Sequence, residues 1–495
     1  MATLEEQVTA LDYSVAGLTD ANYNLTEGVN AMLLVLCGAL VFLMHAGFAM
    51  LCAGAIRSKN TMNILLMTIL DAAVSALAFY LVGWAFAYGG GGGVNANPSP
   101  AANGFIGTNM FALSSFKNDW FANNVAPDGG YSVHWQDWFF QWAFAATATT
   151  IPAGCVAERF NFNAYLGYSF FISAWVYPVI VHWVWSSPGW LGYWRSEDFG
   201  RPLFGAGFID FAGSAVVHMT GGFSGMWGAI LVGPRMGRFD SNGNPVDMPG
   251  HSATLVVLGT CLLWFGWYGF NPGSVLVINT YTAATVMGRA AVCTTLSGAA
   301  GGITALVLTF IRHKAWDLIA VCNGVLVGFV SITAGAHVLE PWAAIIGGGL
   351  GACVFEASCW LWLKLKIDDP LSASPMHGVV GMWACIWTGC MAKQEYVMQA
   401  YGYERGYGLF YPGGGGRVFA SQIIGVLVIF AWITGMMVPF FYIFKMLGML
   451  RISAEEEQAG LDVSKHGGSA YNVEDGKQKS GNGHSNGTGG EPMGL

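Results

Sequence analysis

Charged side chains are scarce in this 495-residue chain, at 10% of residues, whereas soluble domains carry about 25%. Lys and Arg total 21 against 29 Asp and Glu, so there is no basic excess of the kind that binds nucleic-acid phosphates. The ten cysteines stand singly, without a CxxC pair, which argues against a disulfide framework or a zinc site. These absences exclude an ordinary cytosolic enzyme, a disordered protein and a nucleic-acid binder.

Long apolar stretches take the place of the missing charge. Apolar residues make up 54% of the chain, and the mean hydropathy is +0.48. A helix needs about 20 apolar residues to span the hydrocarbon core of a bilayer. We therefore expect an all-α polytopic membrane protein with eleven transmembrane helices, at residues 30–55, 61–88, 135–157, 163–186, 209–233, 251–271, 280–311, 316–335, 340–365, 375–392 and 418–448.

Glycine is unusually frequent, with 69 residues where about 7% of the chain is usual. Small residues spaced four apart let membrane helices approach closely. We expect helix packing, rather than a binding role, for the pairs Gly221/Gly225, Gly298/Gly302 and Gly347/Gly351.

The positions of Lys and Arg predict the orientation, because cytoplasmic connections carry more of both. One set of connections holds eleven basic residues and the other holds seven. The first set is expected in the cytoplasm, with the N-terminus outside and the C-terminus inside. Residues 1–29 are acidic and lack the basic start of a signal peptide, so we expect a retained extracellular segment. The membrane domain would cover 30–448, followed by a cytoplasmic segment at 449–471 and a disordered tail at 472–495.

Two histidines and two aspartates lie within or next to apolar spans, where ionisable groups are expensive and usually functional. Asp210 lies eight positions before His218, and Asp369 lies eight positions before His377. Transporters are often built from internal repeats with the site at the repeat interface. Two halves of five spans place His218 and His377 on the fifth span of each half. We expect symmetry mates near the midplane, with the eleventh span additional.

A single histidine in an apolar helix is usually a core residue, and we expect this for His45, His182 and His337. A symmetric pair can hold haem or a metal, carry protons or line a pore. No other pair of spans repeats the pattern and no quinone or flavin motif is evident, which argues against an electron carrier. A neutral imidazole pair suits a small substrate that forms hydrogen bonds and exchanges protons.

Aromatic residues make up 14% of the chain, with 20 Trp. Most are expected in interfacial belts and packing. Trp185 lies at the outer end of the fourth span, Phe144 within the third, and Phe270 at the end of the sixth, shortly before Ser274. An aromatic face at a pore entrance attracts a cation by about 0.5–2 kcal/mol.

These residues resemble the ammonium transporter family (Amt/Mep/Rh), in its plant and algal plasma-membrane branch. The likeness covers roughly residues 25–471. Its most specific part runs from Asp210 through His218 and continues to Gly233-Pro234-Arg235. Further matches are Ala157-Glu158-Arg159, the stretch from Gly266 to Ser274, Asp368-Asp369-Pro370 and the stretch from Gly460 to Gly468.

The resemblance implies a homotrimer with one pore per subunit, between two inverted five-helix repeats plus an extra C-terminal helix. It implies that Trp185, Ser274 and Phe144 recruit ammonium, and that Asp210 shapes the vestibule and stabilises the cation indirectly. Phe144 and Phe270 would form the gate.

The pore below the gate would be lined by His218 and His377. The resemblance implies no enzymatic activity, no cofactor and no metal; the partners would be ammonium or ammonia, the lipid bilayer and the other subunits. It also implies import across the plasma membrane, by deprotonation of ammonium and passage of ammonia, with net movement of charge. A bare cation crosses hydrocarbon at a much larger desolvation cost than neutral ammonia does.

Two alternatives stay open. One is a passive ammonia or CO2 channel of the Rh type, disfavoured by Trp185, which such relatives generally lack. The other is an ammonium sensor that signals through its tail. Two departures from the family pattern leave local packing and transport rate open: Ser372 replaces an acidic residue, and Val379-Val380 replaces a Gly-Cys pair.

The segment 452–471 is expected to dock rather than to be free. Ser464 occupies the position of a hydroxyl residue that is phosphorylated in the family. The resemblance implies that the tail docks under its own and a neighbouring subunit. Phosphorylation of Ser464 by a protein kinase would expel the tail segment from its docking site, because phosphate adds about −1.5 to −2 charge close to Asp462 and to Glu455–Glu457.

Overall fold

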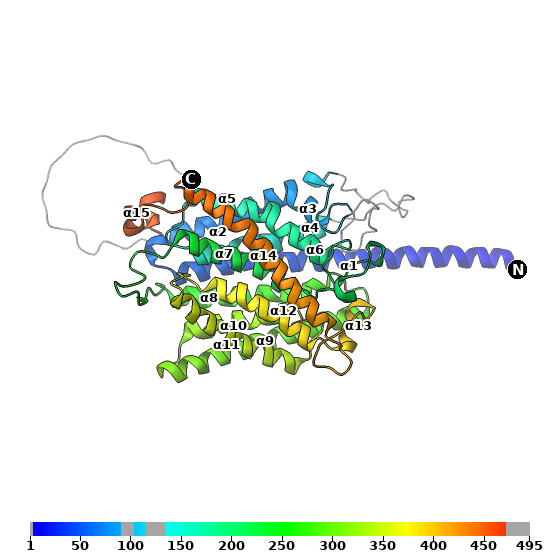
Figure 1. The fold of residues 1–495 in the computed structure, drawn as a ribbon. Coiled ribbons are helices and arrows are strands. Elements are labelled where there is room, and N and C mark those ends of the chain that lie inside the picture. Colours follow the sequence, from blue (N-terminus) through cyan, green and yellow to red (C-terminus); the bar gives the residue numbers. More distant parts are fainter. Residues whose placement is uncertain (1–2, 91–102, 115–134, 472–495) are drawn as a thin grey trace.

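The computed structural model describes residues 3–90, 103–114 and 135–471, and these residues form a bundle of long helices (Figure 1). No strand occurs in this part of the chain, which contains only isolated β-bridges. The predicted all-α, polytopic membrane architecture is confirmed. The predicted disordered tail, 472–495, lies outside the described residues.

Every predicted span coincides with one helix or a run of consecutive helical segments. Eight of these, among the described residues, are long and apolar enough to cross a membrane. They are α1 (Leu4–Ala55), α2–η2–α3 (Thr61–Ala78, Phe79–Gly83, Trp84–Tyr88), α5–η5–α6 (Phe162–Phe171, Ile172–Val176, Tyr177–Trp185), η8–α7 (Ser214–Met219, Thr220–Val232), α8–η9 (Ala253–Phe270, Pro272–Val275), α9 (Tyr281–His313), α11 (Pro341–Lys364) and α14 (Arg417–Met446).

Three more predicted spans correspond to helices that are shorter or less apolar. They are α4 (Trp135–Val156), α10 (Leu318–Thr333) and η10–α12 (Ser374–Val379, Val380–Met391). The total of eleven membrane crossings stays a prediction. Short helices follow outside the spans: α13 (Gln394–Tyr401), α15 (Ala454–Ala459) and α16 (Leu461–His466).

The first helix is much longer than its apolar part. It begins at Leu4 because Thr3 and Glu6 form a capping box, in which each side chain accepts a hydrogen bond from the other residue's backbone N–H. The segment predicted as a separate extracellular region, 1–29, is therefore continuous with the first span from Leu4 onward. Hydropathy identified only the apolar half of this helix.

The paired glycines lie where helices touch. A Cβ on Gly225 of α7 would stand 2.4 Å from Cys155 Sγ of α4, and one on Gly302 of α9 would stand 2.7 Å from Val325 Cγ2 of α10. A Cβ on Gly347 of α11 would lie 2.4 Å from Trp387 Nε1. Any side chain at these positions would push the helices apart, so the glycines allow close packing, as predicted.

A buried ion-pair network joins distant segments at the end of the bundle that carries α15. Arg235, just after α7, bonds Asp368 through Nε at 2.9 Å and Glu158 through Nη1 at 3.0 Å. Arg57 and Arg238 pair with the same two carboxylates. Burial alone would raise the pKa of Asp368, but hydrogen bonds from Arg235 and nearby guanidinium charges outweigh it and lower the pKa to about 2.

Candidate functional site

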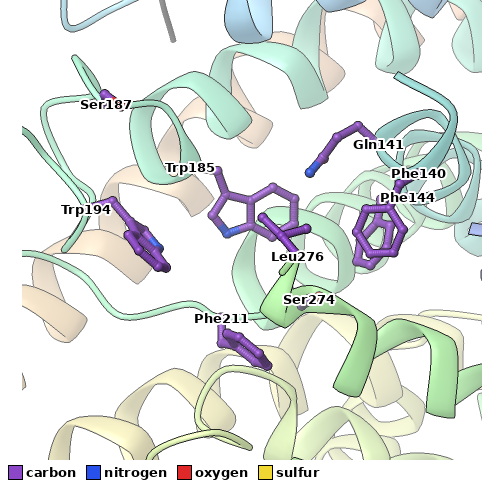
Figure 2. Close-up of a pocket in the computed structure, with 9 residues that line it drawn as sticks. All are labelled: Phe140, Gln141, Phe144, Trp185, Ser187, Trp194, Phe211, Ser274 and Leu276. Carbon is purple, nitrogen blue, oxygen red and sulfur yellow. The ribbon is translucent and has the colours of Figure 1, made fainter. Parts of the chain in front are cut away.

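A cavity of about 100 Å³ opens where α4, α6 and η9 converge (Figure 2). Three of the four predicted recruitment residues, Trp185, Ser274 and Phe144, line it, whereas Asp210 does not. Among the described residues, the lining consists mostly of aromatic and small polar side chains: Phe140, Gln141, Phe144, Trp185, Ser187, Trp194, Phe211, Ser274 and Leu276.

The polar atoms of the cavity are held in place by backbone carbonyl groups. Trp185 Nε1 donates to the carbonyl oxygen of Asp210 at 2.7 Å, and this fixes the indole ring. Ser274 Oγ donates to the carbonyl oxygen of Phe270 at 2.7 Å. Because the serine hydrogen is used in this bond, the hydroxyl oxygen is left as an acceptor for an N–H donor.

Two stacked phenyl rings lie between the cavity and the histidines. The ring centroids of Phe144 and Phe270 are 4.2 Å apart with an interplanar angle of 24°. The rings of Phe144 and Trp185 pack edge to face, with centroids 6.0 Å apart and an interplanar angle of 79°. Phe270 in turn stacks on His218 at 5.5 Å. The predicted gate residues thus form one continuous column from the cavity to the first histidine.

The two symmetry-related histidines meet at the edges of their rings, through one nitrogen of each. Their Nδ1 atoms are 3.1 Å apart, and the ring centroids are 5.1 Å apart at 19°. A hydrogen bond between two Nδ1 atoms requires one protonated and one unprotonated nitrogen, so the two rings hold opposite tautomers. His218 packs against Trp267 at 5.3 Å, and His377 lies 6.2 Å from Phe48. The pair is buried in an apolar environment.

Matching local structures carry the two histidines. His218 lies in the π-helical turn η8 and His377 in the π-helical turn η10. Wide turns of this kind are rare and frequently mark functional sites. The eight-residue spacing from aspartate to histidine in the sequence therefore reflects a repeated helix start.

Asp210 and Asp369 build those helix starts. Asp210 Oδ1 accepts from the N–H groups of Gly213 and Ser214, and Oδ2 accepts from those of Ala215 and Val216, at 2.7–3.1 Å. Gly213 has φ +104°, which moves the start of the fifth helix from the predicted residue 209 to Ser214. The carboxylate of Asp210 is thus directed at backbone N–H groups rather than into the cavity.

Asp369 repeats this arrangement in the other half. Its carboxylate accepts from the N–H groups of Ala373 and Ser374 and from Ser374 Oγ. Four N–H groups without partners at a helix start favour a negative charge there. Each aspartate therefore orients the turn that carries its histidine.

Sequence reasoning missed several cavity residues. Phe140 lies one helical turn from Phe144 on α4 and could have been found from that spacing. Phe211 and Trp194 come from irregular segments, which no periodicity predicts. Trp267 is one turn from Phe270 on α8 and packs on His218.

Three other histidines in the described part of the chain, His45, His182 and His337, are buried in the protein core, as expected. The ring nitrogens of His182 lie 2.8 Å from the carbonyl oxygens of Ala87 and Asn103. His337 contacts the hydroxyl of Tyr401 at 2.9 Å. His45 stacks on Phe42 with centroids 5.5 Å apart.

Comparison with known proteins decides what this arrangement belongs to. The model of the Ammonium Transporter Family matches residues 32–471. The chain belongs to the ammonium transporter family. It is a multi-pass membrane transporter for ammonium or ammonia and not an enzyme, in agreement with the sequence-based prediction.

Relatives in plants and solved structures give the same result. The transporter is 48% identical over 462 residues to ammonium transporter 1 member 3 of Solanum lycopersicum, covering 91% of this chain and 94% of that one. It is 48% identical over 435 residues to ammonium transporter 1 member 2 of Arabidopsis thaliana, covering 86% and 80%.

Among solved structures, the transporter resembles a "Sensor Amt Protein" with a TM-score of 0.75 and 31% identity, covering 90% of this chain and 99% of that one. It also resembles Candida albicans Mep2 with a TM-score of 0.71 and 25% identity, covering 86% and 87%.

The tail of the transporter lies against the start of its second helix. Asp462 accepts hydrogen bonds from the backbone N–H groups of Met62 and Asn63, both at 3.0 Å. Asn60 Oδ1 accepts from the N–H of Leu461 at 2.9 Å, and Lys59 Nζ donates to the carbonyl oxygens of Glu457 and Gln458. Asp462 thus caps α2 from a position 400 residues later in the chain.

Ser464 lies in this docked helix. Its hydroxyl donates to the carbonyl oxygen of Gly460 at 2.8 Å, and the side chain is half-buried. Glu457 in the neighbouring helix α15 is buried and accepts from Arg451 Nη2 at 2.7 Å and from the N–H of Met236 at 2.7 Å. Acidic groups of the tail are therefore already engaged with the body of the protein.

Proposed function

We propose that this chain imports ammonium across the plasma membrane by binding the cation in the aromatic cavity and passing ammonia along the histidine pair. The observation that carries the proposal is the unbroken column from Trp185 and Phe144 through Phe270 to His218 and His377. A cation-binding entrance and a buried imidazole pair stand in series along it.

The chemistry of the cavity suits ammonium. The indole of Trp185 and the ring of Phe144 offer π faces to a cation, and Ser274 Oγ offers a hydrogen-bond acceptor. The part of the lining that the structure describes contains no carboxylate, so a cation is not trapped there by a full opposite charge. Ammonium can donate to Ser274, whereas potassium, of similar size, has no proton to donate.

Below the phenyl rings, the environment favours the neutral form. Phe270, Trp267 and the two imidazoles replace water with apolar and weakly polar surfaces around the path. Ammonia enters such a region at far lower cost than ammonium, and it can both donate to and accept from imidazole nitrogens. The proton released at the entrance follows separately, so that net charge moves inward with each ammonium.

The working unit is proposed to be a homotrimer with one pore per subunit, each pore lying between two inverted five-helix halves. The cavity and the free end of α1 face outward, and the tail faces the cytoplasm, as the distribution of Lys and Arg predicts. Figure 1 shows the start of α1 and α15 at opposite ends of the bundle, as this orientation requires.

Regulation by the tail is part of the proposal. A docked α16 holds the cytoplasmic end of α2 in its conducting arrangement. Phosphorylation of Ser464 by a protein kinase removes its bond to Gly460 and places a dianion next to the buried carboxylates of Asp462 and Glu457. Helix α16 then dissociates from the start of α2, and transport stops.

Voltage-clamp recording with labelled ammonium in oocytes tests the transport mode. The expected result is an inward current that saturates with ammonium and carries one charge per labelled ammonium. Labelled uptake without current would replace the proposal with a passive ammonia channel. Neither uptake nor current in protein shown to be at the surface would refute import altogether.

A further inference from the structure

The N-terminal part of α1 stands clear of the rest of the molecule. At 1.5 Å per residue, a helix of 52 residues is about 78 Å long, and the hydrocarbon core of a bilayer accounts for only about 30 Å. Every residue from 3 to 25 is exposed, and Figure 1 shows this end of the helix extending beyond the bundle. Residues 4–29, called here the N-terminal arm, make few contacts with the body.

The arm carries a continuous heptad repeat. Apolar residues alternate at spacings of four and three, with Leu at each d position and Val at every a position except Asn22. This is the pattern of helices that pair through knobs-into-holes packing. The positions are Leu4 (d), Val8 (a), Leu11 (d), Val15 (a), Leu18 (d), Asn22 (a), Leu25 (d) and Val29 (a).

No other segment of the described chain packs against this apolar stripe. Leu4 is 78% exposed, Leu11 63% and Leu18 71%. An amphipathic helix that exposes its apolar stripe to water along several turns requires a partner for that stripe.

We propose that the N-terminal arm forms a parallel, in-register coiled coil with the same arm of other copies of this chain. Asn22 supports this occupant, since a single Asn at an a position is a known device for setting register between identical helices. The arms are parallel because every copy enters the membrane in the same orientation.

Charge argues against a lipid surface as the occupant. The arm carries five acidic residues and neither Lys nor Arg, so it is repelled by anionic lipids. Three of the acids, Glu6, Asp20 and Glu27, occupy f positions, which face away from the seam of a coiled coil. The g position Gln7 meets the e position Asp12 of the partner helix, so no like-charged e–g pair opposes assembly.

The stripe also runs without a break into the membrane part of α1. The next d and a positions are Met32 and Leu36, which are 63% and 58% exposed. The same helix face therefore stays open from the arm down into the span. A second copy of the helix can pack along this whole face. A partner confined to the arm would leave the part of the face within the membrane span uncovered.

The number of strands follows from the assembly that holds the arms. Val at a with Leu at d favours two strands in isolated coiled coils. In the homotrimer proposed above, the membrane domains would hold three arms close together at high effective concentration and supply the third strand. Pairing between copies is the proposal itself, and it does not depend on the transport mechanism.

A cysteine scan over one heptad of the full-length protein in native membranes tests it. Leu11→Cys, Val15→Cys and Leu18→Cys are expected to form disulfide-linked copies under mild oxidation, because core positions face each other across the seam. Tyr13→Cys and Asp20→Cys, at f positions, serve as matched controls and should remain monomeric on a reducing-agent-free gel. The parent chain measures the background from the natural cysteines.

Equal linkage at core and f positions, or linkage at none of them, would overturn the proposal. A second arm of the experiment removes the stripe by the double change Leu11→Asp and Leu18→Asp. It should abolish cross-linking through Val15→Cys while ammonium current per surface copy stays unchanged. Persistent linkage in that background would also contradict the coiled coil. Loss of current in the parent chain would instead count against the proposed function, and it leaves the linkage result unaffected.

Discussion

At the scale of single residues, the site combines weak contacts rather than one strong charge. Trp185, Phe144 and Ser274 surround a cavity that has no carboxylate among its described lining residues, and Asp210 uses its carboxylate oxygens on backbone N–H groups. Such a site binds a cation loosely enough to release it. It follows that substitution of any one of these side chains should measurably change the apparent affinity for ammonium.

Trp185→Leu is expected to raise the half-saturation concentration for ammonium about two- to thirtyfold, the equivalent of a cation–π contact worth about 0.5–2 kcal/mol. Current–concentration curves, normalised to surface abundance, provide the measurement. Trp183→Leu is the matched control, because Trp183 points its Nε1 at the carbonyl of Phe105 and does not line the cavity. Equal affinity in both variants would remove Trp185 from the binding site.

His218→Ala or His377→Ala is expected to reduce ammonium transport, and the double variant should also admit potassium. The reason is that either change removes the Nδ1–Nδ1 bond and opens a buried apolar path to water. Currents carried by ammonium and by potassium in the same cells give the selectivity. Normal current with normal exclusion of potassium in the double variant would show that the histidines have no role.

At the scale of helices, the sequence predicted where the helices lie in the chain better than it predicted the residue at which each helix begins. Each apolar run coincides with a helix of the bundle, because a helix that spans lipid needs about 20 mostly apolar residues; α4, α10 and η10–α12 are shorter or less apolar than the other eight in the described chain. The start of the fifth helix was misplaced because Asp210 and Gly213 delay it, which depends on hydrogen bonds and φ values rather than hydropathy. The arm of α1 was missed as a helix, since a half-polar heptad repeat has low hydropathy.

The docked helix α16 gives a test at this scale. Ser464→Asp should abolish current at normal surface abundance, whereas Ser464→Ala should conduct. Asp462→Ala should also reduce current, because Met62 and Asn63 lose the acceptor for their N–H groups. Voltage clamp with surface labelling measures both. If Ser464→Asp and a chain truncated before Gly460 transport normally, the tail is not a switch.

At the scale of the whole molecule, contacts between distant segments decide what the sequence could not show. The aspartate–histidine spacing predicted the twin histidines, because a repeat leaves the same pattern twice. Phe211 and Trp194 were out of reach, since only the fold brings irregular segments to the cavity. The same holds for Arg235, whose partners Glu158 and Asp368 are far away in sequence.

Asp368→Asn should destabilise the protein by about 3–5 kcal/mol, because it leaves buried Arg235 without its main counter-charge. The folded pKa of Asp368, about 2, lies below its ordinary value of 3.8. The stabilisation is therefore fully present above pH 3.8 and is lost as the pH falls toward 2. Thermal unfolding followed by tryptophan fluorescence at neutral and acidic pH measures this.

Asp247→Asn is the matched control for this change, since Asp247 is an exposed acid in the same connection as Arg235. It should leave the unfolding temperature unchanged at every pH. An Asp368→Asn protein as stable as the control at neutral pH would show that the network contributes nothing to stability.

The cap on α2 also sets an order of events during synthesis. The N–H groups of Met62 and Asn63 bond to Asp462, which leaves the ribosome 400 residues later. At about 5–20 residues per second, that interval lasts about 20–80 s. Until then water must satisfy the first turn of α2 at the surface of the membrane. This end of the transporter is thus completed last, when the spans have already been made, and a chain that stops early never closes it.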